Sequence, residues 1–307
     1  MPKVELKYKS EAFLILVTIL WGATFVIVKE ALYDISTMAF IFIRFALAGI
    51  ILSPFILRKR ISGKSLSGGI LLGILLFTGF ATQTIGLKFT SATKSGFLTG
   101  TAVIMIPFLQ ILIENKKPNK GVMIGAFLVL IGISLLSSGG ESIISLFNDL
   151  GSNFNIGDIF TLICALFFAL YIIFLDVETK RHDFVILLFL QIITTAVLSF
   201  IFLFVFSASE LEEIRINLTG NLISALLYTS IFATLITTAL QTKYQKNVTP
   251  AKAGIIFSLE PLFAAVFAFF ILGEKITNFG YLGAALILTG LILSEIYEYL
   301  FLKNGKE

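Results

Sequence analysis

The chain has little that catalysis or metal binding could use. It contains one cysteine, Cys164, and one histidine, His182, among 307 residues. A single cysteine excludes an intrachain disulfide and a cysteine metal cluster, so we expect Cys164 to pack as a small apolar side chain. His182 lies in a charged loop with no nucleophile or metal ligand beside it in the sequence. We therefore expect no enzyme, no cofactor and no metal site.

A phosphate-binding loop is also missing. The one candidate, Gly63-Lys64-Ser65, lacks the upstream glycine that such a loop needs in order to wrap phosphate groups. An ATP-driven pump is therefore not expected, and the loops are too short to hold a soluble domain.

Charge is scarce as well. Only 14% of the residues are charged, whereas 57% are hydrophobic and the mean hydropathy is +0.97. Soluble domains have about 25% charged residues, so most of this surface must face lipid. The basic residues form short clusters between apolar runs, and nucleic acid is not an expected partner.

The apolar residues form ten segments, each close to or above the ~20 residues that a helix needs to cross a bilayer. The predicted fold class is therefore an all-α integral membrane protein with ten transmembrane helices. The expected segments are Ala12–Val28, Ser36–Leu57, Leu66–Leu87, Ser95–Ile113, Gly121–Ser138, Ile159–Leu175, Phe184–Phe206, Leu218–Thr242, Ala253–Leu272 and Ile276–Ser294.

Lysine and arginine set the expected orientation. They concentrate before the first segment and after the second, fourth, sixth, eighth and tenth, which predicts that both termini are cytoplasmic in a multi-pass protein of the plasma (inner) membrane. The opposite side holds only Lys29, Lys88, Lys94, Arg215 and Lys275.

One stretch occurs twice. Shifting Ala81–Gly132 by 158 positions onto Ala239–Gly290 aligns a glutamine-threonine pair, three lysines and three glycines. A shift of 147 positions extends the repeat weakly toward the N-terminus and aligns Gln191 with Arg44. We therefore predict one five-helix repeat at 12–138, an extracytoplasmic linker at 139–157, and a second repeat at 158–296.

Five helices is an odd number, so the second repeat must enter the membrane from the opposite side. Such inverted repeats are typical of carriers whose substrate site lies near the midplane, between the halves. In the linker, residues 142–150 are a candidate for a short interfacial helix.

Two ionisable residues lie deep within predicted helices. Arg44 is roughly 12 Å from the outer end of its helix at 1.5 Å per residue, and must face the bundle or a water-filled cavity. Glu260 lies within the ninth helix and precedes Pro261, which removes a backbone donor. We expect Arg44 to bind or gate and Glu260 to couple protons or fix the helix break. The alternative for each is a structural role.

Lys94 and Lys252 occupy equivalent positions in the two copies. Each lies in the first turn of its helix, where a helix N-terminus and a lysine together attract an anionic group. We assign both to coupling or gating, with an interfacial anchor as the alternative.

Further polar edges and aromatic faces lie inside the apolar helices, and we expect them to line a cavity for a small-molecule substrate. The expected lining residues are Trp21, Gln83, Thr99, Tyr171, Gln191 and Tyr228, with Thr82 and Gln241 as further candidates.

The chain resembles the drug/metabolite transporter superfamily, and within it the EamA-type ten-helix carriers. The resemblance covers about residues 12–296, although Glu114-Asn115-Lys116 departs from the Leu-Gly-Glu-like ending often seen there. The residues that carry it are Leu20-Trp21-Gly22 with Phe25, Arg44-Phe45, Ser91-Ala92, Gly96-Phe97-Leu98, Pro107, Gly157-Asp158, Ala165 through Tyr171, Thr249-Pro250-Ala251, Glu260-Pro261-Leu262-Phe263 and Leu272-Gly273-Glu274.

The resemblance implies inverted five-helix repeats around a central cavity that opens to one side at a time. Family members export amino acids, other metabolites or drugs. We expect a secondary active exporter of small organic solutes, with protons as a candidate coupling ion and no assigned oligomeric state. The alternatives are an uncoupled facilitator and a membrane receptor or scaffold that transports nothing.

Overall fold

The computed structural model describes residues 3–57, 59–137, 154–267, 269–270 and 277–303. Within these ranges the backbone is helical apart from short connections and an isolated antiparallel bridge between Ile35 and Ile216. The expected all-α fold class is confirmed. The proposed interfacial helix at 142–150 and the Leu272-Gly273-Glu274 motif lie outside the described residues.

Ten stretches of the described chain are long and apolar enough to cross a membrane, which confirms the expected number of spans. Six are single helices, and the other four are built from shorter pieces. The six are α3 (Thr37–Ile56), α4 (Gly63–Phe89), α7 (Lys120–Ser137), α9 (Ile156–Thr179), α10 (Phe184–Ala208) and α15 (Asn278–Lys303).

The composite spans are the first, fourth, eighth and ninth. Irregular backbone at membrane depth is tolerated only where it is buried in protein or lines a cavity, so these four spans indicate where a site can lie. Their pieces are α1 (Lys3–Gly22) and α2 (Thr24–Ala31); α5 (Ala92–Gly100) and α6 (Ala102–Glu114); α11 (Gly220–Ser230), the π-helix η1 (Ile231–Ile236), α12 (Thr237–Tyr244) and the 3-10 turn η2 (Gln245–Asn247); and α13 (Pro250–Phe257) and α14 (Glu260–Phe267).

Side-chain caps set several helix starts. Ser62, at the start of α4, accepts a hydrogen bond from the Ser65 amide at 3.1 Å, and so the helix begins before its apolar run. Asn155 and Asp158 form a reciprocal capping box at the start of α9. These caps satisfy amides that would otherwise lack partners at the helix N-termini.

The fourth and ninth spans break at equivalent positions. Pro261 has no N–H for the carbonyl of Phe257, and the ninth span is interrupted between α13 and α14. The fourth span breaks at Thr101, which aligns with Leu259 under the 158-position shift, although Val103 stands at the position equivalent to Pro261. The Thr101 hydroxyl donates to the carbonyl of Leu98 at 2.6 Å and offers the backbone an alternative to the helical bond.

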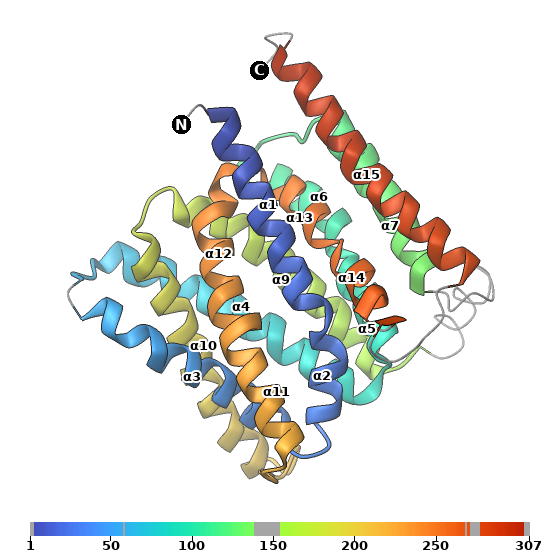
Figure 1. The fold of residues 1–307 in the computed structure, drawn as a ribbon. Helices are drawn as coiled ribbons and strands as arrows, with labels where there is room; N and C mark the ends of the chain where they lie inside the picture. Colours follow the sequence, from blue (N-terminus) through green and yellow to red (C-terminus); the bar gives the residue numbers. More distant parts are fainter. Residues whose placement is uncertain (1–2, 58, 138–153, 268, 271–276, 304–307) are drawn as a thin grey trace.

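Helices α7 and α15 pack along each other through paired glycines (Figure 1). A Cβ on Gly125 would lie 2.6 Å from the Gly290 carbonyl oxygen, and one on Gly132 would lie 2.7 Å from that of Gly283. The 158-position shift exchanges these pairs, because it places Gly125 on Gly283 and Gly132 on Gly290. A two-fold axis between the two copies would produce this exchange.

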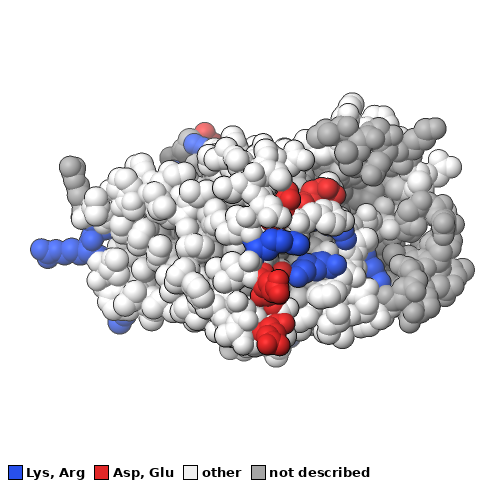
Figure 2. Space-filling model, turned by 90° about the horizontal axis from the view of Figure 1, so that it is seen from below, with Lys and Arg blue, Asp and Glu red and all other residues white. Residues whose placement is uncertain are grey.

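Helix α1 begins and α15 ends at the same end of the bundle (Figure 1), as an even number of spans requires. Seen from the opposite end, charges of both signs gather near the middle of the face, while the flanks carry few (Figure 2). Apolar side chains such as Leu112 and Ile50 are exposed on the sides of the bundle, as lipid contact demands. The cytoplasmic location of the termini stays a prediction.

Candidate functional site

A cavity lies where the interrupted helices meet. About 890 Å³ of space there is not filled by protein atoms, including the part that is open to solvent. Its walls come from every span except the fifth, seventh and tenth. Both halves of the chain therefore contribute to one site.

Most residues predicted to act lie on this cavity. The cavity brings together five polar or aromatic residues from five different spans, all of which were expected to bind substrate or to gate. Glu260, the expected coupling residue, and the adjacent Pro261 also line it. These seven are Trp21, Arg44, Gln83, Thr99, Tyr171, Glu260 and Pro261. Their contact with a substrate stays a prediction.

Arg44 is held by the π-helix of the eighth span. Its Nε donates to Thr234 Oγ1 at 2.5 Å and its Nη2 donates to the carbonyl oxygen of Ala233 at 2.9 Å. The guanidinium also lies 4.5 Å from the ring centroid of Phe80, in a cation–π contact. A π-helix changes the backbone register and so offers carbonyl oxygens to other donors. The guanidinium is thus fixed at the cavity wall.

Trp21 donates hydrogen bonds to the same part of the eighth span. Its indole Nε1 donates to the Ala233 carbonyl oxygen and to Thr237 Oγ1, both at 3.2 Å. Its ring lies at a tilt against Phe257, with centroids 5.5 Å apart. The indole is thus oriented by three groups and presents a fixed aromatic face to the cavity.

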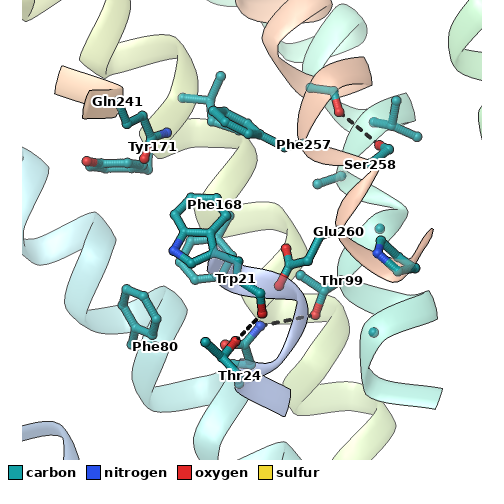
Figure 3. A pocket seen from close by; sticks show the side chains of 18 of the residues that line it. Trp21, Thr24, Phe80, Thr99, Phe168, Tyr171, Gln241, Phe257, Ser258 and Glu260 are labelled. Atoms are coloured by element: carbon teal, nitrogen blue, oxygen red, sulfur yellow. Dashed lines mark hydrogen bonds between the residues drawn. The ribbon is translucent and has the colours of Figure 1, made fainter. Parts of the chain in front are cut away.

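Glu260 projects into the cavity from the first residue of α14, toward the side where Trp21 lies (Figure 3). Its carboxylate has no hydrogen-bond or salt-bridge partner among the described residues, and the charge of Arg44 acts on it from a distance. The first span approaches closely here, since a Cβ on Gly22 would lie 2.9 Å from the Phe263 Cβ. An acid without a partner inside a membrane bundle is a candidate for binding a cation or a proton.

A smaller polar wall lies on the first-half side of the cavity. Gln83 donates from Nε2 to Thr99 Oγ1 at 3.4 Å, and Thr99 in turn contacts the Cys164 sulfur at 4.0 Å. Gln241 and Ser258 add further polar groups. The site therefore combines one acidic side chain, Glu260, one basic side chain, Arg44, and several neutral hydrogen-bonding groups.

Gln191 and Tyr228 are not among the cavity's lining residues, contrary to expectation. Gln191 is fully buried behind the wall, where Oε1 accepts from the Tyr171 hydroxyl at 2.7 Å and Nε2 donates to Thr242 Oγ1 at 2.9 Å. The Tyr228 hydroxyl donates to the carbonyl of Leu20 at 2.7 Å. These three bonds satisfy polar groups within the protein, so each side chain joins one span to another.

Lys94 and Lys252 also lie outside the cavity wall. Lys94 Nζ is 2.8 Å from Asp158 Oδ2, and Lys252 Nζ is 2.5 Å from Glu11 Oε1. Each lysine thus meets a carboxylate of this chain at the helix N-terminus where the sequence suggested an external anion.

Sequence reasoning missed the aromatic lining. Phe25, Phe80, Phe168 and Phe257 line the cavity together with Trp21. With 32 phenylalanines in the chain, composition cannot separate cavity-lining rings from lipid-facing ones. The closeness of Phe257 to the proline break was the one signal available. In the part of the chain that is described, no three His, Cys, Asp or Glu side chains are placed to hold a metal ion.

The fold and cavity define a multi-pass membrane protein with a cavity between its two halves. The sequence profile of the EamA-like transporter family matches residues 9–138 and 155–296, and the chain belongs to this family. It is therefore a transporter.

Similar proteins agree with this assignment. The chain is 35% identical over 283 residues to a protein named an uncharacterized transporter from Archaeoglobus fulgidus, covering 92% of this chain and 84% of that one. It is 26% identical over 286 residues to the uncharacterized transporter YoaV of Bacillus subtilis, covering 92% and 94%. A solved crystal structure aligns with a TM-score of 0.75 over 94% of this chain and 98% of that one at 14% identity, which shows a shared fold.

Proposed function

We propose that the protein is a secondary active transporter that exports small organic metabolites, amino acids among them, or drugs from the cytoplasm by alternating access. The observation that carries the proposal is the cavity itself. It lies at the junction of the two halves, beside equivalent helix breaks, and holds one acid and one base among aromatic faces. Broken helices at the midplane between repeats are typical of secondary carriers.

The charged groups suit solutes that carry charges of their own. Arg44 is the natural partner of a carboxylate, because guanidinium binds carboxylates with directed hydrogen bonds. Glu260 suits an ammonium group, because its carboxylate has no hydrogen-bond partner within the described part of the chain and is available to a solute. The rings of Trp21, Phe168 and Phe257 offer apolar contact and, for an amine, cation–π attraction.

Proton coupling is part of the proposal and rests on Glu260. A carboxylate at the wall of a cavity that opens to one side at a time can take a proton from one solution and release it to the other. Competition between a proton and a cationic substrate for the same acid would couple their movements.

Transport into proteoliposomes tests the proposal. The panel comprises radiolabelled amino acids, primary amines and aromatic organic cations, with and without an imposed pH gradient. We expect accumulation of at least one member against its gradient when the lumen is acidic, and its loss in Glu260→Gln. Glu213→Gln is the matched control, because Glu213 is exposed outside the spans.

Three results would contradict parts of the proposal. Solute flux that runs only down the solute's own concentration gradient would identify an uncoupled facilitator. A pH dependence that survives Glu260→Gln would remove that residue from coupling. A folded protein that moves no member of the panel would favour a receptor or scaffold.

A further inference from the structure

Two lysine–carboxylate pairs flank the cavity, and each joins the two halves of the chain. Lys94 of the first half meets Asp158 of the second, with their polar atoms 2.8 Å apart. Lys252 of the second half meets Glu11 of the first at 2.5 Å. The side chains of Lys252 and Asp158 are almost fully buried, with exposed fractions of 1% and 0%.

The two pairs are the same pair in the two copies of the repeat. The 158-position shift places Lys94 on Lys252, and the 147-position shift places Glu11 on Asp158. The structure thus brings each lysine to the carboxylate that the repeat predicts for it, although the two shifts belong to different stretches of sequence. Two independent helix packings, of α5 on α9 and of α13 on α1, produce the same contact.

Each pair lies next to the cavity but at a different end of it. Lys94 precedes the cavity-lining Gly96 by two residues, and Lys252 precedes the cavity-lining Gly254 by two. Helix α13 lies toward the end of the bundle where α1 begins, and α5 lies nearer the opposite end (Figure 1). Opening the cavity to either side would draw one of these lysines away from its partner.

The energetics of such a pair suit a contact that must break and re-form. Removing two charges from water offsets most of their attraction, so a buried pair contributes little net stability when it is complete. When the end opens, water solvates both charges and replaces the lost contact. When it closes, a lysine without its carboxylate would be strongly disfavoured, so the closed geometry is specific.

We propose that the two pairs are the alternating gates of the carrier. Lys94–Asp158 holds the fourth span against the sixth and closes the end opposite the termini. Lys252–Glu11 holds the ninth span against the first and closes the end near the termini, where Glu295 and Lys7 join the cluster. This inference rests on the alternating access of the proposed function, and adds which contacts must separate in each half-cycle.

Side-specific labelling of the cavity tests the gates without a substrate. The parent protein carries Cys164→Ala and Thr24→Cys, because Thr24 lines the cavity. In proteoliposomes of known orientation, a membrane-impermeant maleimide is added to either side and the labelling rate is measured. Since no transport is required, failure of the gates can be told apart from failure of the transport assignment.

We expect Lys94→Gln to raise labelling from the end opposite the termini by about fivefold or more, without raising it from the other end. Lys252→Gln should do the reverse. The paired variants Lys94→Gln with Asp158→Asn and Lys252→Gln with Glu11→Gln should give the same results while leaving neither member of the pair charged. These paired variants test the gates in the case where a single variant does not fold.

The matched control is Lys180→Gln with Asp176→Asn, a 2.6 Å pair at the C-terminal end of α9 that does not join the halves. It should leave both labelling rates unchanged. Equal changes from both sides in the gate variants, or no change in either, would overturn the proposal.

Discussion

Trp21 and Arg44 donate hydrogen bonds to the same acceptor, the carbonyl oxygen of Ala233. The two donors come from the first and second spans, and the acceptor belongs to the π-helix of the eighth. One irregular turn thus fixes both the aromatic face and the positive charge of the cavity. Because the donors share one carbonyl, disturbing either should shift the other.

The first prediction concerns this shared acceptor. Arg44→Lys keeps the charge but cannot donate to Thr234 and Ala233 with the fixed geometry of a guanidinium. We expect a loss of about 1–3 kcal/mol in stability, because the buried hydroxyl oxygen of Thr234 is left without its donor, together with loss of transport. Thermal unfolding in detergent and counterflow measure the two effects.

The control for this experiment is Arg60→Lys, since Arg60 is exposed outside the spans. A second check is Trp21 fluorescence, because Trp21 is the one tryptophan of the chain. Its emission should shift in Arg44→Lys and stay constant in Arg60→Lys. An Arg44→Lys protein with unchanged stability, transport and emission would remove the shared acceptor from the mechanism.

The second prediction concerns the glycines between α7 and α15. Gly132→Ala and Gly283→Ala each place a Cβ within 2.7 Å of the partner's backbone oxygen, so neither helix can yield by a side-chain rotation. We expect each to lower the unfolding free energy by ~1–3 kcal/mol, the usual effect of overpacking. Gly220→Ala is the control, because nothing lies within 4 Å of its added Cβ. Tolerance of alanine at both positions would mean that the helices are farther apart.

Much of the architecture followed from hydropathy. Ten apolar runs gave ten spans, and polar residues such as Arg44, Glu260 and Gln83, which lipid would not tolerate, lie on one cavity. The free-energy cost of placing a charge in lipid explains this success, because a charged side chain in an apolar helix must face the bundle interior or a water-filled cavity.

The failures have a physical cause as well. Gln191 lies on the buried face of α10, which packs on other helices. The sequence of this helix does not distinguish a polar side chain that contacts a solute from one that contacts a neighbour, as Gln191 contacts Tyr171. The break at Thr101 has no proline, and the π-helix at Ala233 has no local signature. Asp158 lies in the first turn of α9, and Glu11 directly precedes the first expected apolar segment, Ala12–Val28. A carboxylate at either place is ordinarily solvated, so their lysine partners emerge only from packing.

The third prediction concerns the pH dependence of stability that arises from the exposed ion pair between Lys59 and Asp183. Lys59 donates to Asp183 at 2.8 Å, and this hydrogen bond holds the pKa of the Asp183 carboxyl below its ordinary value. A lowered folded-state pKa contributes stability above the unfolded pKa, and the contribution is lost as pH falls through the folded value. Lys59→Gln should therefore be less stable than the parent near neutral pH and equal to it in acid.

The size of that effect should stay below ~1 kcal/mol, because both side chains are 40% or more exposed. Unfolding midpoints in detergent between about pH 3 and 7 measure it around the ordinary aspartate pKa of ~4. Lys64→Gln, at an exposed lysine in the first turn of α4, should show no pH-dependent difference. A gap between Lys59→Gln and the parent that widens in acid would contradict the assignment.

The last prediction returns to the break in the ninth span. Pro261→Ala restores an N–H that can donate to the carbonyl of Phe257 and allows α13 and α14 to join. A continuous helix would turn Glu260 relative to Arg44 and remove a bending point. We expect transport to fall about tenfold, equivalent to ~1.4 kcal/mol in the barrier, while the unfolding midpoint stays level or rises.

Pro54→Ala separates this effect from the general effect of removing a helix proline. Pro54 lies inside α3 and is not part of the cavity wall, so its replacement should leave transport unchanged. A folded Pro261→Ala protein that transports at the parent's rate would show that the cycle does not bend the ninth span at this point. The equivalent break at Thr101, which forms without proline, would then be the better candidate for movement, because its backbone can change hydrogen-bond partners while the ring of Pro261 holds one angle fixed.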